Sequence, residues 1–287
     1  MVASPWFLTS ETAAGLDSDA VRVYCFPHAG GNPRTFLGWQ PALDGHALVA
    51  AVCPPGRGHR FREPAPVSLA ALADGAAAAV ALADGAAAAV ALAEDRRGIR
   101  ARALPPFLLF GHSFGAVLAF EVARRLDGVH GFAGLVASGC AAPSLLPTPR
   151  VVEAARLEGR AFAEAVGFFG GLPPEVVRDE ALQELLLPHL KADFRMVAAH
   201  RHRPGPPLTV PVTLLNGTDD PHVGPAALDP WTRECTTPPE RHWAAGGHFY
   251  FEDRPDAATS LLSSLAQAAA AAASGPTVPG AEYVELI

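Results

Sequence analysis

The sequence predicts a single α/β domain in which helices flank a mostly parallel central sheet. The first observation is a short apolar stretch of strand character, Pro106 to Phe110, which runs directly into Gly-His-Ser-Phe-Gly and then into a segment of helical period ending at Leu126. The second is a set of continuous apolar runs, such as 47–53 and 132–138, which are typical of strands buried on both faces. Helical segments alternate with these strands, as in a parallel sheet.

The turn at 111–115 has the composition of a strained connection from strand to helix. Gly111 and Gly115 let the chain reverse where any Cβ would clash, so Ser113 is held at the tip with the helix N-terminus behind it. A Gly-x-Ser-x-Gly match alone also occurs in ordinary glycine-rich loops. The strand before it and the amphipathic helix after it favour a functional turn, so Ser113 is the candidate nucleophile.

Length and composition fit one globular domain with an insertion. The chain has 287 residues, of which 49% are hydrophobic and 18% charged. We expect the domain to span 1–267 with a helical lid at about 141–207, and 268–287 to be the end of an alanine-rich helix and a flexible tail. The net charge of −7 argues against a nucleic-acid surface. The N-terminus has neither a basic start nor a long apolar segment, so we expect a cytoplasmic protein without a signal peptide or membrane anchor.

The cysteines and histidines do not have the spacing of a disulfide framework or a metal site. No Cys-x-x-Cys pair is present, and His200-Arg201-His202 lacks the spacing that places two ligands on one helix face. We expect reduced, buried thiols and no bound metal. The four cysteines are Cys25, Cys53, Cys140 and Cys235.

The N-terminal half begins with an alternating strand at 21–26 that leads into a loop with a glycine pair, Gly30-Gly31. Close backbone approach in such a loop suits a pocket made of N–H groups. A short helix at 36–43 and the strand at 47–53 follow. The loop at 54–64 is rich in proline and glycine and carries a basic cluster, for which a solvated surface and a binding role are both open.

Residues 71–80 and 81–90 are identical, Ala-Leu-Ala-Asp-Gly-Ala-Ala-Ala-Ala-Val twice. Ten residues advance an α-helix by about 1000°, roughly 80° short of whole turns, so the two copies cannot present the same side chains to one neighbour. Alanine favours helix, while Gly75 and Gly85 each cost about 1 kcal/mol. We therefore expect one long helix from Ser68 to about Glu94, which a tandem duplication either lengthens by about three turns or buckles locally.

Between 141 and 207 the alternation of strands and helices stops, and three helical pieces follow, at 151–169, 173–187 and 190–200. An all-helical insertion between two strands of an α/β sheet is typical of a lid over the carboxyl ends of the strands. Its apolar side chains either form the small core of the lid or contact a substrate. They include Leu157, Phe162, Phe168, Phe169, Leu182, Leu186, Leu187, Phe194 and Met196.

The core pattern returns after the lid with a strand at 210–216 and an acidic turn, Gly217 to Val223. A Gly-Gly-His loop at 246–248 comes later, before a terminal helix. The remaining elements are a helix at 225–235, a strand near 241–244, the last helix at 255–273 and a tail from Ser274 onward.

Three residue types now stand in the order serine, aspartate, histidine, with the serine in a tight turn. This is the chain order of α/β-hydrolases. Serine is a weak nucleophile at neutral pH, so an imidazole must take its proton and a carboxylate must orient that imidazole. His248 is the histidine in a glycine-flanked loop beyond the acidic turn. Between the two aspartates, the spacing from Gly217 to Val223 favours Asp220, and Asp219 stays open.

The sequence resembles the type II thioesterases of polyketide and non-ribosomal peptide assembly lines, over roughly residues 5–266. The matching segments stand in the order of that family and together are specific. They are FPHAGG (26–31), PPGRGHRFREP (54–64), LFGHSFGA (109–116), ELLLPHLKADF (184–194), GTDDPHV (217–223) and GGHFYF (246–251). The duplication in the long helix and the tail after Ala273 depart from the family pattern.

The resemblance implies an α/β-hydrolase fold and a stand-alone enzyme that removes acyl groups from the phosphopantetheine thiol of carrier proteins. By position, Ser113, Asp220 and His248 form the triad, and the N–H groups of Ala29 and Phe114 form the oxyanion hole. Carrier proteins would be transient partners of a monomer, and no metal or redox cofactor is implied. We also expect substrate contacts from His28, Phe162, Phe168, Phe194 and Met196.

Other functions on the same fold stay open at this stage. A carboxylesterase or lipase would use the same triad, although the loop Pro-His-Ala-Gly-Gly differs from the His-Gly-Gly-Gly type of many lipases. An acyltransferase would differ only in the acceptor. For carrier-protein docking, the candidates are the basic cluster Arg57, His59, Arg60 and Arg62, and secondly Arg201 and Arg203.

Overall fold

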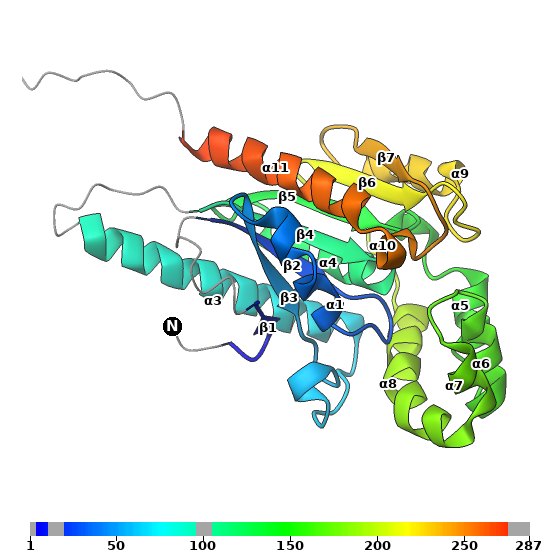
Figure 1. Ribbon diagram of the computed structural model, residues 1–287. Coiled ribbons are helices and arrows are strands. Elements are labelled where there is room, and N and C mark those ends of the chain that lie inside the picture. The colour runs from blue at the N-terminus through cyan, green and yellow to red at the C-terminus, as the bar shows by residue number, and fades with distance from the viewer. Residues whose placement is uncertain (1–3, 11–19, 96–104, 275–287) are drawn as a thin grey trace, which may run out of the picture.

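The computed structural model describes residues 4–10, 20–95 and 105–274. Seven strands form one sheet in the order β1-β3-β2-β4-β5-β6-β7, and all neighbours are parallel except β1, which pairs antiparallel with β3 (Figure 1). The mostly parallel α/β sheet predicted from the sequence is confirmed. The strands are β1 (Phe7–Leu8), β2 (Val21–Phe26), β3 (Ala47–Val52), β4 (Phe107–His112), β5 (Phe132–Ser138), β6 (Val212–Gly217) and β7 (Glu240–Ala244).

Helices cover both faces of the sheet (Figure 1). The long helix α3 (Leu69–Asp95) and α4 (Phe114–Leu126) pack together on one face. On the other face α11 (Asp256–Ser274) packs with α2 (Gln40–Leu43), and α1 (Arg34–Leu37) packs on β3. No helix in the described ranges combines the length and the apolar character needed to cross a bilayer.

The strands supply alternate side chains to the two cores. On β2, Tyr24 and Phe26 belong to the core beneath α3 and α4, whereas Val23 and Cys25 belong to the core beneath α11. Successive side chains of a strand point to opposite faces, so a strand covered on both sides is apolar throughout. All four cysteines are buried free thiols, as predicted.

Four helices between β5 and β6 stand together beyond the carboxyl ends of the strands (Figure 1). We call them the lid; they are α5 (Pro149–Ala154), α6 (Gly159–Gly167), α7 (Pro174–Arg178) and α8 (Glu180–Ala199). Three predicted boundaries were wrong. The predicted helix at 173–187 is divided between α7 and α8 because Asp179 is extended. The predicted helix at 151–169 is interrupted because Glu158 is extended and Gly159 has φ +48°. The break predicted near Pro188 is absent, since α8 continues through that proline while Leu187 and Leu190 pack into the lid core.

Other helix boundaries also differ from the predictions. The segment 36–43 forms two short helices that meet at Gly38 and Trp39. The segment 225–235 forms α9 (Pro225–Leu228) and a 3₁₀ turn, and α10 (Tyr250–Asp253) precedes α11. The tail predicted to be flexible, from Gly275 onward, lies outside the described residues.

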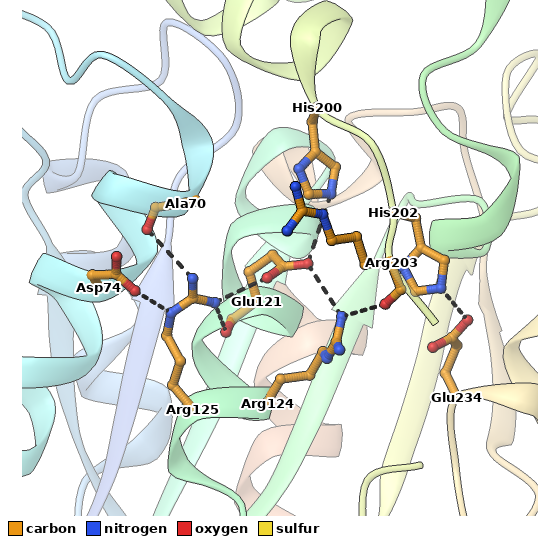
Figure 2. Close-up of polar contacts among 9 residues, drawn as sticks. All are labelled: Ala70, Asp74, Glu121, Arg124, Arg125, His200, His202, Arg203 and Glu234. Atoms are coloured by element: carbon orange, nitrogen blue, oxygen red, sulfur yellow. Dashed lines mark hydrogen bonds and ion pairs between the residues drawn. The ribbon is translucent and has the colours of Figure 1, made fainter. Parts of the chain in front are cut away.

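A polar network fastens α4 to the long helix and to the segment that leaves the lid (Figure 2). Arg125 of α4 donates to Asp74 of α3 at 2.6 Å, and Arg124 donates to the backbone oxygen of Arg203 at 2.9 Å. Glu121 accepts from Arg125 at 2.9 Å, and Nε2 of His202 lies 2.9 Å from Oε1 of Glu234. The helix that begins at the tight turn is therefore tied to its neighbours at its far end.

The duplicated segments have different surroundings, as their helical offset predicts. Leu72 of the first copy is 1% exposed, whereas its counterpart Leu82 is 74% exposed. The two aspartates diverge in the same way: Asp74 bonds to Arg125, whereas Asp84 pairs with Arg22 of β2 and accepts from the Tyr24 hydroxyl at 3.2 Å. Each copy makes its own contacts.

Deleting residues 81–90 should leave a soluble, folded protein. The deletion moves 91–95 ten places forward, so Glu94 takes the helical position of Asp84 and can supply the carboxylate for Arg22 and Tyr24. In the shortened chain, Glu94→Ala should then cost on the order of 1–3 kcal/mol of unfolding free energy, measured by denaturant titration, because it leaves Arg22 without its partner. Asp84→Ala in the full chain is the matched control and should cost the same. An insoluble shortened chain, or a neutral Glu94→Ala, would contradict this account.

Candidate active site

Ser113 stands at the junction of β4 and α4 in a strained backbone conformation. Its φ of +54° and ψ of −116° make it the one non-glycine residue with positive φ in the described part of the chain. A Cβ on Gly111 would lie 2.2 Å from the Gly115 oxygen, and one on Gly115 would lie 2.1 Å from the Phe26 oxygen. Any side chain at either glycine would force the backbone apart, so the two glycines are what permits this turn.

The second and third members of the predicted triad meet through two touching loops. A Cβ on Gly217, at the end of β6, would lie 2.2 Å from the backbone oxygen of Gly247, so these loops are in backbone contact. Across them the Nδ1 atom of His248 lies 2.7 Å from Oδ2 of Asp220. The structure thus brings His248 together with Asp220, the aspartate that the spacing from Gly217 to Val223 favoured.

The environment of Asp220 suits an ionised carboxylate. Its Oδ1 accepts hydrogen bonds from the backbone N–H groups of His222 at 2.8 Å and Val223 at 3.3 Å. Burial alone would raise the pKa of Asp220, but the hydrogen bond to His248 and the N–H group of His222 lower it below its usual value. Asp219 is exposed, and its carboxylate accepts only from the Thr218 hydroxyl among the described residues.

Ser113 and His248 share the wall of a cavity of about 540 Å³ between the sheet and the lid. Ala29 and Phe114 also line it. Residues 26 and 27 lie directly against Gly115, which brings the loop carrying Ala29 beside the start of α4. In the described part of the chain the N–H groups of Ala29 and Phe114 donate no hydrogen bond, so both are available to an acceptor in the cavity.

Most of the remaining cavity wall is apolar and comes from both the core and the lid. One face of α8 contributes four residues at helical spacing. The residues that line the rest of the cavity include Val117, Cys140, Leu146, Val151, Val166, Phe169, Leu190, Asp193, Phe194, Val197, His222 and Phe249.

Of the five residues expected to contact substrate, the structure places His28 and Phe194 in the cavity wall and the other three elsewhere. Met196 lies two residues from Phe194 on α8, about 200° around the helix, and packs into the core beneath α4. Phe162 is fully buried in the lid core, where its ring meets Phe194 edge-on. Phe168 is 55% exposed with the Arg150 guanidinium over its ring. None of these three side chains lines the cavity.

Several wall residues were missed because sequence alone does not show which lid face meets the core. Phe169, which the sequence grouped with the other apolar lid residues, lines the cavity, whereas its neighbour Phe168 does not. His222 lies within the acidic turn and stands 5.2 Å from His248, ring centre to ring centre. The one sequence feature that could have indicated this position of His222 is that it follows Asp220 by two residues.

Three histidines near His248 are held neutral. Burial lowers the pKa of His28 to about 4, with further effects from His248 and Arg57. Burial and His248 also hold the pKa of His112 well below its usual value and lower that of His222. Because a second positive charge beside His248 is disfavoured, only His248 is in a position to carry a proton during a reaction.

Half of the basic cluster at 57–62 is buried, whereas His59 and Arg62 are exposed. Arg57 and Arg60 are each 8% exposed. Arg57 pairs with Asp193 of α8, while Arg60 pairs with Glu63, bonds to the backbone oxygen of Cys53 and lies over the Trp6 ring. The side chains of Arg57 and Arg60 therefore contact other parts of the protein and are not exposed for docking to a carrier protein.

The chain is similar to thioesterases in sequence and in fold. Residues 21–268 match the thioesterase domain family. The Thioesterase PikA5 of Streptomyces venezuelae is 34% identical over 239 residues, covering 83% of this chain and 78% of that protein. Among solved structures, the type II thioesterase BorB of the borrelidin cluster has a TM-score of 0.74 and 30% identity, covering 93% and 99% of the two chains. RedJ of Streptomyces coelicolor has a TM-score of 0.66 and 32% identity, covering 88% and 87%.

The neutral histidines should make the fold less stable as pH falls. The unfolded chain binds a proton at each near pH 6.5, and the folded chain only at lower pH, so the unfolding free energy falls below about pH 6.5. For His28 the window extends down to about pH 4. We expect His28→Gln to reduce this slope by up to one proton, about 1.4 kcal/mol per pH unit, in denaturant titrations. His46→Gln, at an exposed site, is the control. A slope unchanged by His28→Gln would contradict the assignment.

Proposed function

We propose a function for this chain from the premise that it belongs to the thioesterase family. It is a stand-alone type II thioesterase that hydrolyses acyl groups from the phosphopantetheine thiol of acyl or peptidyl carrier proteins, and so removes aberrant or stalled groups. The observation that carries this proposal is the strained Ser113 in one cavity with His248, whose Nδ1 atom is bonded to Asp220 at 2.7 Å.

The reaction would begin with attack of the Ser113 hydroxyl on the thioester carbonyl. Asp220 engages Nδ1 of His248, which leaves Nε2 to take the serine proton. The lowered pKa of Asp220 keeps its carboxylate ionised beside the imidazolium that forms. Asp220 therefore stabilises the charged His248 without taking the proton itself.

The negative charge that develops on the thioester oxygen would be held by the N–H groups of Ala29 and Phe114. Each such donor contributes about 3 kcal/mol to lowering the barrier. A thiol with a pKa of about 8.5 departs more readily than an amine, so little acid assistance is required. Water activated by His248 then releases the acid from acyl-Ser113, and these steps call on no metal or redox cofactor.

The cavity supports an acyl substrate of apolar character. Its wall combines aliphatic and aromatic side chains from the core and the lid, with Val117, Leu146 and Phe194 among them. An apolar cavity with a few polar groups can bind an acyl chain along its apolar wall, while the polar groups orient the carbonyl of that chain. Phe194 and His28 remain proposed substrate contacts.

The partner is proposed to be a carrier protein that docks transiently on a cytoplasmic monomer. BorB is a type II thioesterase from the borrelidin biosynthetic cluster, and RedJ is a thioesterase from the prodiginine biosynthetic pathway. Exposed arginines that remain for docking are Arg62, Arg201 and Arg203.

Paired substrates test the reaction class. The protein should hydrolyse an acyl-pantetheine thioester at a kcat/KM at least tenfold above that for the matched oxygen ester, and the free acid should be the main product even when amines or alcohols are offered. Ser113→Ala should fold normally and lose activity by on the order of 10⁴-fold or more. Preference for the oxygen ester would favour a carboxylesterase, and an amide or ester as the main product would favour an acyltransferase.

A further inference from the structure

A buried carboxylate on the lid reaches the loop that carries Ala29. Asp193 of α8 is 5% exposed, and its Oδ2 atom accepts a hydrogen bond from the backbone N–H of Gly30 at 2.8 Å. The same oxygen pairs with Arg57, from the loop after β3. One lid helix and two loops of the core therefore meet at a single oxygen atom.

Arg57 is held by hydrogen bonds both to its own loop and to the lid helix α8. Its guanidinium donates to the backbone oxygen of Gly56 in its own loop at 3.1 Å and to that of His189 on α8 at 3.4 Å. Burial raises the pKa of Asp193, and the Arg57 charge and the Gly30 N–H group act against that rise. Buried ion pairs add little net stability, since desolvation offsets their attraction, but their geometry is well defined. The effect of this pair is therefore to fix positions.

A second contact holds the same loop from the lid side. Gly30 has φ +70°, and a Cβ added there would lie 2.9 Å from Cδ1 of Leu190, one turn before Asp193 on α8. From the core side, the backbone at residues 26 and 27 rests on Gly115. The loop of Ala29 and Gly30 is thus contacted by the lid on one side and by the start of α4 on the other.

We propose that Asp193, together with Arg57, is a positioning residue that lets the lid helix α8 align the Ala29 N–H group in the oxyanion hole. This inference rests on the proposed function of Ser113 and Ala29. Lifting α8 from the core would break the hydrogen bond to Gly30 and release the loop. The oxyanion hole would then be complete only while the lid is seated, which couples lid closure to the chemical step.

Substitutions at Asp193 test this positioning role, with a small acyl-thioester that is not attached to a carrier protein as the substrate. Asp193→Ala, which removes both the charge and the acceptor, should lower kcat by about 10- to 100-fold with KM changed less than threefold. Asp193→Asn, nearly equal in shape, should lower it less, because an amide oxygen can still accept from Gly30. Arg57→Met should act in the same direction. Lys191→Met is the matched control, since Lys191 is a buried charge on the same helix that pairs with Glu158 inside the lid.

Inhibitor binding separates positioning from general damage. A trifluoromethyl ketone analogue forms a tetrahedral oxyanion on serine, whereas a thioether analogue mimics only the bound substrate. The affinity for the ketone should fall in parallel with kcat/KM in Asp193→Ala, the affinity for the thioether should stay within threefold, and Lys191→Met should change neither.

Three results would overturn the inference. They are full kcat in a folded Asp193→Ala, a raised KM at constant kcat in that variant, and equal losses in Lys191→Met. Ser113→Ala in the same assay separates this inference from the proposed function. An active Ser113→Ala would reject the proposed function, whereas an inactive Ser113→Ala beside a fully active Asp193→Ala would reject only the positioning role.

Discussion

Backbone contact at two glycines is the constraint on which the rest of the site depends. Gly111 and Gly115 let β4, the turn at Ser113 and the first residues of α4 approach within a distance that no side chain permits. The same approach seats the loop after β2 against α4, so it places Ala29 beside Phe114 as well. The strained φ of Ser113 is the cost of this arrangement, and the well-packed α4 maintains it.

The other parts of the site are attached to this core by equally close contacts. Gly217 and Gly247 join the loops of Asp220 and His248, so the carboxylate and the imidazole are fixed by backbone contact as well as by their own hydrogen bond. The lid adds the apolar wall, and its Asp193 pairs with Arg57 and accepts a hydrogen bond from the Gly30 N–H in the loop of Ala29. Strands, helices and close backbone contacts therefore hold the reacting groups.

The sequence predicted the parts of the site that depend on local geometry. The turn at Ser113 and the spacing from Gly217 to Asp220 are set by neighbouring residues, and they could be found from short patterns. The burial of Arg57 could not, because its partner Asp193 lies 136 residues further along the chain. The same holds for Met196 and Phe194, since apolar character is shared by both and only the docking of α8 decides which one faces the cavity.

The central claim is that the acyl group passes from the thiol to Ser113 before water releases it. Two thioesters with the same acyl group but different thiols, hydrolysed in the presence of a small alcohol, test it directly through the ratio of ester to acid formed. Both pass through one acyl-Ser113, so the ratio should be identical for the two substrates at every alcohol concentration. A ratio that depends on the departing thiol would mean that water and alcohol attack the thioester itself, and would contradict the account.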